Sequence, residues 1–118
     1  MKEDRVYLLH IRDAIERALL YTAEGKQAFF ADPRTQDAVI RNLEVLGEAV
    51  ENLSGDLKAR HATVPWKRIA GMRDKMIHEY LAVNLQLVWD TVEQEIPPLK
   101  KEIEAILRES AEGRGSSG

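Results

Sequence analysis

The sequence predicts an all-α protein, an antiparallel four-helix bundle formed by a single domain. Apolar residues recur at intervals of three and four through most of the chain, which is the spacing of one face of an α-helix. No stretch shows the strict apolar–polar alternation of a β-strand, and no internal repeat is evident. The links between the predicted helices are short, which favours antiparallel neighbours in a bundle.

The first two helices are predicted over residues 3–24 and from about residue 33 to residue 53. Gly25 ends the first helix, and the two phenylalanines of the connection 29–33 are expected to plug the end of the bundle. Gly47 costs about 1 kcal/mol relative to alanine inside a helix, so it predicts the close approach of another backbone. The apolar stripes are Leu8, Ile11, Ile15, Ala18 and Leu19, then Val39, Leu43, Leu46, Val50 and Leu53.

A short helical turn is expected at residues 56–61, before the third and fourth helices. The third helix starts near Pro65, because proline after threonine and valine marks a helix start, and it ends near His78–Tyr80. The fourth helix begins at Asn84, a good N-cap. Pro97-Pro98 interrupts its hydrogen-bond ladder, so a kinked or broken C-terminal helix is expected there. The stripes are Trp66, Ile69, Met72 and Met76, then Leu85, Val88, Val92, Ile96, Leu99, Ile103 and Ile106.

The chain has 118 residues, enough for one domain, predicted over residues 1–110 with a flexible tail at 111–118. It has no cysteine, which excludes disulfides, thiolate metal sites and cysteine nucleophiles. The N-terminus lacks the apolar core of a signal peptide, and no apolar run approaches the ~20 residues of a membrane span. We therefore expect a cytoplasmic protein that does not enter a membrane.

Charge is distributed unevenly. The net charge is −3, but the segment from Leu57 to His78 carries +5 and the remainder −8. The segment holds one acid, Asp74, and six bases: Lys58, Arg60, Lys67, Arg68, Arg73 and Lys75. Such a patch either attracts a phosphate backbone or is a solvated face balanced by neighbouring helices. Glu44 and Glu48 likewise form a solvated acidic face or position nearby basic side chains.

Arg73, His78 and Tyr80 lie close together at the end of the predicted third helix. Asp74 precedes His78 by four residues, so its carboxylate can hold the imidazole and favour the charged form. A guanidinium, a side chain that titrates near neutrality and a phenol suit phosphate chemistry. The alternative is a structural histidine, because a helix C-terminus favours a positive charge in any case.

The pattern Arg-x4-His-x-Tyr, here Arg73, His78 and Tyr80, resembles the signature of HEPN-domain proteins of the HepT-like toxin branch. The similarity covers nearly the whole chain up to about residue 108. The flanking blocks that agree are Leu46-Gly47-Glu48-Ala49, Pro65-Trp66-Lys67-Arg68-Ile69-Ala70-Gly71-Met72, Val88-Trp89-Asp90-Thr91-Val92 and Pro97-Pro98-Leu99. Many HEPN motifs have asparagine directly after the arginine, where this chain has Asp74.

The resemblance implies a homodimer in which the Arg-x4-His residues of both protomers line one cleft. It implies a metal-independent endoribonuclease without a cofactor, acting as the toxin of a type VII-like toxin–antitoxin system. The implied antitoxin is a minimal nucleotidyltransferase that silences the toxin by attaching AMP to the motif tyrosine, here Tyr80. Asp74 is expected either to help catalysis or only to orient His78.

The chemistry can also be argued from the residue types. RNA carries its own nucleophile, the 2′-hydroxyl, so His78 can serve as general acid or base while Arg73 stabilises the transition-state charge. Tyr80 would position the phosphate or the leaving group. The RNA backbone is expected to contact Lys67, Arg68 and Lys75. Two alternatives remain: a non-catalytic companion of a nucleotidyltransferase that binds a nucleotide or partner, and a structural helical dimer whose basic patch meets an acidic partner.

Overall fold

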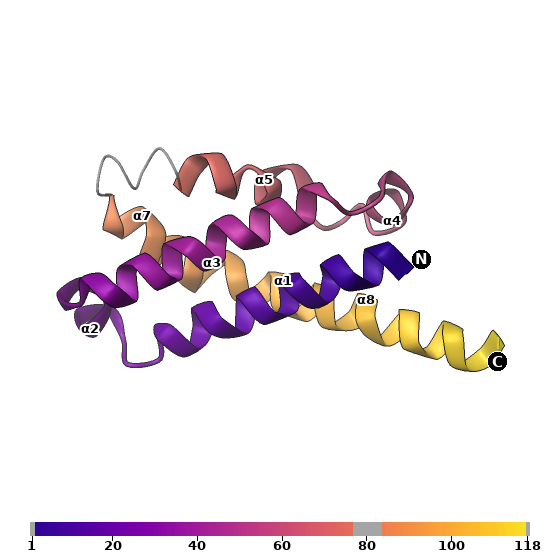
Figure 1. Cartoon of the computed structure of the whole chain (residues 1–118), viewed down its shortest axis with the longest axis horizontal. Coiled ribbons are helices and arrows are strands. Elements are labelled where there is room, and N and C mark those ends of the chain that lie inside the picture. The colour runs from indigo at the N-terminus through magenta and orange to yellow at the C-terminus, as the bar shows by residue number, and fades with distance from the viewer. Residues whose placement is uncertain (1, 77–83, 118) are drawn as a thin grey trace.

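The computed structural model describes residues 2–76 and 84–117, and all regular structure within them is helical. This confirms the predicted all-α class. The elements are α1 Lys2–Tyr21, α2 Lys26–Ala31, α3 Pro33–Glu51, α4 Gly55–Arg60, α5 Trp66–Ala70, α7 Leu85–Asp90, the π-helix η1 Thr91–Glu95 and α8 Ile96–Ser117. Along the molecule, α1, α3, the α5 segment and α8 run in alternating directions (Figure 1). Residues 72–76 are helical as well.

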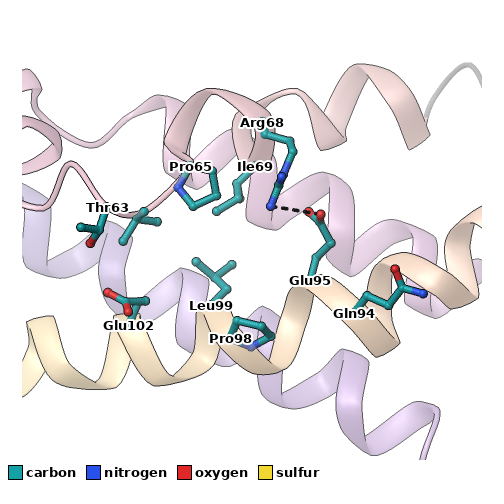
Figure 2. A pocket seen from close by; sticks show the side chains of 10 residues that line it. Thr63, Pro65, Arg68, Ile69, Gln94, Glu95, Pro98, Leu99 and Glu102 are labelled. Atoms are coloured by element: carbon teal, nitrogen blue, oxygen red, sulfur yellow. Dashed lines mark ion pairs between the residues drawn. The ribbon is translucent and has the colours of Figure 1, made fainter.

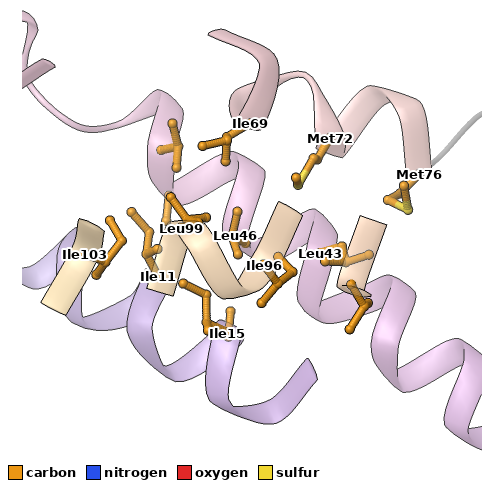
Figure 3. Packing of buried hydrophobic residues seen from close by; sticks show 14 of the residues in the cluster. Ile11, Ile15, Leu43, Leu46, Ile69, Met72, Met76, Ile96, Leu99 and Ile103 are labelled. Atoms are coloured by element: carbon orange, nitrogen blue, oxygen red, sulfur yellow. The ribbon is translucent and has the colours of Figure 1, made fainter. Parts of the chain in front are cut away.

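The core lies where the predicted apolar stripes meet. Figure 3 shows Ile11 and Ile15 of α1, Leu43 and Leu46 of α3 and Ile96 of α8 converging between the helices. All five side chains are essentially inaccessible to solvent. Burying apolar side chains of this size supplies about 1.5–3 kcal/mol each, so the stripes determine which helix faces turn inward.

The connection between α1 and α3 contains a short helix, α2, that was predicted only as a link. Gly25 precedes it with φ of 102°, a backbone conformation that favours glycine. Phe29 is buried and packs on Trp89, with ring centroids 5.6 Å apart. Phe30 is 38% exposed, so only the first phenylalanine plugs the core.

Capping residues determine where α3 begins. Asp32 is its N-cap: one carboxylate oxygen accepts the N–H of Arg34 at 3.0 Å and the other the hydroxyl of Thr35 at 2.8 Å. Pro33 follows at the first helical position, where its missing N–H costs nothing. The hydrogen bonds hold the pKa of Asp32 below its ordinary value of 3.8, with the Thr35 hydroxyl as the largest cause.

A long-range contact and a local contact fix the position of the α4 region. Buried Asp4 of α1 accepts hydrogen bonds from the N–H and the hydroxyl of Ser54, the N-cap of α4, at 2.8 and 2.7 Å. The indole N–H of Trp66 donates to the carbonyls of Lys58 and His61 at 3.2 and 3.0 Å. These contacts fix the path of the chain into α5.

The predicted interruption of the C-terminal helix takes the form of a π-helix. In η1 the N–H of Ile96 donates to the carbonyl of Thr91, five residues earlier, instead of four. Pro97 and Pro98 follow within α8, which continues as a helix. The widened turn thus directly precedes the residues that cannot donate.

The predicted tail begins within α8 in the described structure. The helix continues to Ser117, so the backbone of residues 111–117 extends the C-terminal helix. The flexibility expected for this tail, and the domain boundary at residue 110, stay predictions. No helix in the described ranges is long and apolar enough to cross a membrane.

Candidate active site

Arg73 lies on an exposed helical turn anchored by two buried methionines. The N–H of Gly71 donates to the carbonyl of Lys67, and the N–H of Lys75 donates to that of Gly71, both at 3.0 Å. Met72 and Met76 point from this turn into the bundle (Figure 3) and are buried. Arg73, Asp74 and Lys75, between them, are exposed. The turn is therefore amphipathic: its methionines pack in the core, and its charged side chains face solvent.

Gly47 brings the backbone of this turn against α3, as its position in the sequence predicted. A β-carbon at Gly47 would lie 2.8 Å from the backbone nitrogen of Arg73 and 3.2 Å from its Cβ. It would also lie 3.1 Å from the carbonyl oxygen of Ala70. Glycine is therefore needed here for space, because an added carbon would collide with the residue that carries the guanidinium.

One acidic side chain of α3 reaches Arg73, and it is Glu51. Its carboxylate lies 4.0 Å from Nη1 of Arg73, and the two side chains are 50% and 44% exposed. An ion pair this open contributes at most about 1 kcal/mol. Glu44, considered as a possible positioning acid, instead pairs with Arg41 at 3.5 Å. Glu48 is exposed.

The three basic residues assigned to RNA binding are all exposed, although they differ in setting. Lys67 and Arg68 lie in α5, and Lys75 lies one helical turn beyond Gly71. Arg68 pairs with Glu95 of η1 at 3.2 Å (Figure 2). Both residues of this pair line a pocket of about 180 Å³ that Arg73 does not line. Its lining also includes Thr63, Pro65, Pro98, Leu99 and Glu102.

His78 and Tyr80 lie outside the described residues, so the structure shows the motif from Arg73 only as far as Met76. Within the described ranges, no three His, Cys, Asp or Glu side chains are grouped so that they could hold a metal ion. Sequence analysis missed Glu51, although Gly47 and Glu51 are four residues apart and therefore share a helix face. That spacing was the available signal.

Comparison with known proteins identifies the chain's relatives. The family described as ribonuclease HepT-like matches residues 11–106. A protein of Caldanaerobacter subterraneus subsp. tengcongensis named "Putative RNase" is 46% identical over 110 residues, which cover 92% of this chain and 97% of that protein. A "probable ribonuclease HepT" of Thermococcus cleftensis is 44% identical over 101 residues, covering 85% and 92% of the two chains. No solved structure matches the chain.

The match of the family spans most of the bundle, from within α1 to within α8, and includes Gly47, Glu51 and Arg73. Both relatives are covered over nearly their whole length, so the similarity concerns the entire domain. The family description and the names of both relatives give the same activity, the cleavage of RNA. The chain belongs to the ribonuclease HepT-like family of RNA-cleaving enzymes.

Proposed function

We propose that the chain is a metal-independent endoribonuclease that acts as the toxin of a type VII-like toxin–antitoxin system in the cytoplasm. The observation that carries the proposal is the exposed side chain of Arg73, on a helical turn whose backbone packs closely against Gly47. The chain that carries this arginine belongs to the ribonuclease HepT-like family. An exposed guanidinium on a fixed backbone can bind a phosphodiester with two parallel hydrogen bonds.

The proposed reaction is an internal transesterification. The 2′-hydroxyl oxygen of the RNA forms a bond to phosphorus while the bond from phosphorus to the 5′-oxygen breaks. A general base takes the proton of the 2′-hydroxyl, and a general acid protonates the departing 5′-oxygen. The products are a 2′,3′-cyclic phosphate and a 5′-hydroxyl, so no water is consumed in this step.

His78 is proposed as the acid or base, and Arg73 as the group that stabilises charge on the phosphoryl oxygens. One motif histidine per chain can fill one of the two proton-transfer roles at a time. A homodimer with two-fold symmetry would supply the second copy across a shared cleft. Asp74 then supports His78, and Lys67, Arg68 and Lys75 bind the RNA backbone along the basic segment.

Tyr80 is proposed to position the phosphate or leaving group and to be the site of control. A minimal nucleotidyltransferase antitoxin would transfer AMP from ATP to the phenol oxygen, releasing pyrophosphate. The added nucleotide would bring bulk and a negative charge to the motif tyrosine, and the negative charge would oppose binding of the RNA phosphate. Co-expression with such a nucleotidyltransferase should therefore give a mass gain in AMP units that the Y80F variant does not show.

Cleavage of RNA in the presence of EDTA tests the proposal. The wild-type protein should cut RNA, and R73A should lose at least a hundredfold in rate while keeping its helical circular dichroism spectrum. If neither protein cuts RNA but R73A binds nucleotides more weakly, the chain is the non-catalytic companion instead. Cleavage that requires a divalent metal would reject the metal-independent mechanism.

A further inference from the structure

Gly47 differs from the other glycines for which the described structure shows the surroundings. A β-carbon at Gly55 would meet nothing within 4 Å, and at Gly71 it would meet only carbonyl oxygens at 3.4 Å, an ordinary contact. At Gly47 the nearest atom is 2.8 Å away and belongs to the backbone of Arg73. Backbone cannot move aside as a flexible side chain can. The absence of a side chain at Gly47 therefore allows the backbone of Arg73 to lie this close to α3.

Glu51 lies one helical turn beyond Gly47 in α3 and contacts the other end of Arg73. The two contacts have different strengths. The Gly47 contact is a close packing of backbone against backbone, whereas the Glu51 carboxylate stays 4.0 Å from an exposed guanidinium. A phosphate that accepts two hydrogen bonds from the guanidinium can replace so weak a partner.

We propose that Gly47 and Glu51 together position Arg73 for catalysis. Gly47 is a positioning residue that fixes the backbone from which the arginine extends. Glu51 is the partner that holds the guanidinium in the free enzyme and gives it up to the RNA phosphate. This inference rests on the proposed function, in which Arg73 binds the scissile phosphodiester.

The first test compares the kcat of G47A and G55A for RNA cleavage. Both variants add one methyl group to a helix, but only G47A places it against Arg73. A displacement of about 1 Å at a catalytic group can cost a hundredfold, so G47A should lose about ten- to a hundredfold in kcat and G55A less than twofold. A wild-type kcat in folded G47A would overturn the role of Gly47.

A double variant separates positioning from general damage. If Gly47 acts through Arg73, G47A should cause no further loss of the residual rate in an R73A background. The same fractional loss in both backgrounds would show that Gly47 serves only the fold. R73A itself isolates the underlying proposal: full activity in R73A rejects the proposed function, whereas inactive R73A with fully active G47A rejects only this inference.

The second variant, E51Q, is informative even where G47A does not fold, because Glu51 is half exposed. The probe is a 2′-O-methyl RNA, which lacks the nucleophile and cannot be cut. E51Q should bind it about two- to fivefold more tightly at low salt, since the competing carboxylate is gone, and the gain should shrink as salt rises. The gain in affinity should be absent when E51Q is made in the R73A background. Unchanged or weaker binding by E51Q would overturn the role of Glu51.

Discussion

Asp4 and Ser54 are separated by 50 residues in the sequence, yet they form two hydrogen bonds of 2.8 and 2.7 Å. The serine hydroxyl also accepts the N–H of Leu57 and so caps α4. One buried carboxylate in the first turn of α1 thereby orients the N-cap of α4, the helix that follows α3. This contact holds α4, which begins the path from α3 to the candidate site.

Removal of the Asp4 carboxylate should therefore destabilise the fold. Hydrogen bonds to a charged group contribute about 1.5–3 kcal/mol, so D4A should lower the free energy of unfolding by about that amount in urea titrations. The matched control is E3A, because Glu3 is also an acid in the first turn of α1 but is exposed. Equal losses in both variants would mean that only the helix dipole is affected.

The indole N–H of Trp66 should make a measurable contribution separate from its packing. W66F keeps an aromatic ring but loses the donor to the carbonyls of Lys58 and His61, so a loss of about 1–2 kcal/mol is expected. W89F is the control: Trp89 is equally buried, and its indole N–H donates to no partner in the described structure. A larger loss in W89F than in W66F would contradict this assignment.

Asp32 should make the stability of the protein depend on pH in the acidic range. Its folded-state pKa lies below the ordinary value of 3.8, so its contribution is complete above that value and is lost as pH falls through the lowered pKa. The difference in melting temperature between wild type and D32A should shrink across this range. In an NMR titration, T35A should raise the pKa of Asp32, because the Thr35 hydroxyl is the largest cause of the shift. An unchanged pKa in T35A would contradict this cause.

Lys75 should contribute to RNA binding through charge alone. K75A should weaken binding about equally for different RNA sequences and reduce the slope of log K against log salt by about 0.7. Lys101 is the control, since it is exposed on α8 and lies outside the basic segment. A sequence-dependent loss in K75A, or an equal loss in K101A, would argue against a specific backbone contact at Lys75.

Local patterns predicted most of the fold, because the helical stripes and caps depend on neighbouring residues. Asn84 caps α7 as predicted, with its side chain accepting the N–H of Leu87 at 3.1 Å. Gly47 marks a close backbone approach, as expected of a glycine retained within an apolar helix. Pro97-Pro98 predicted a kink or a break in the C-terminal helix, and the structure instead has a π-helix just before the two prolines.

Contacts across the bundle could not be predicted in the same way. The pairing of Asp4 with Ser54 and of Arg73 with Glu51 depends on the relative rotation of helices that are distant in the sequence. Phe30 is apolar like Phe29, and only the orientation of α2 leaves it exposed. For the candidate site, the sequence supplied Arg73 and Gly47, and the structure added the acid that faces the guanidinium.

The central claim is that Arg73 and His78 cut RNA without a metal ion, and it is tested most directly by product analysis with H78A in EDTA. Wild-type protein should yield fragments ending in a 2′,3′-cyclic phosphate and a 5′-hydroxyl, and folded H78A should yield none above background. Undiminished cleavage by H78A, or products ending in a 5′-phosphate, would contradict the mechanism.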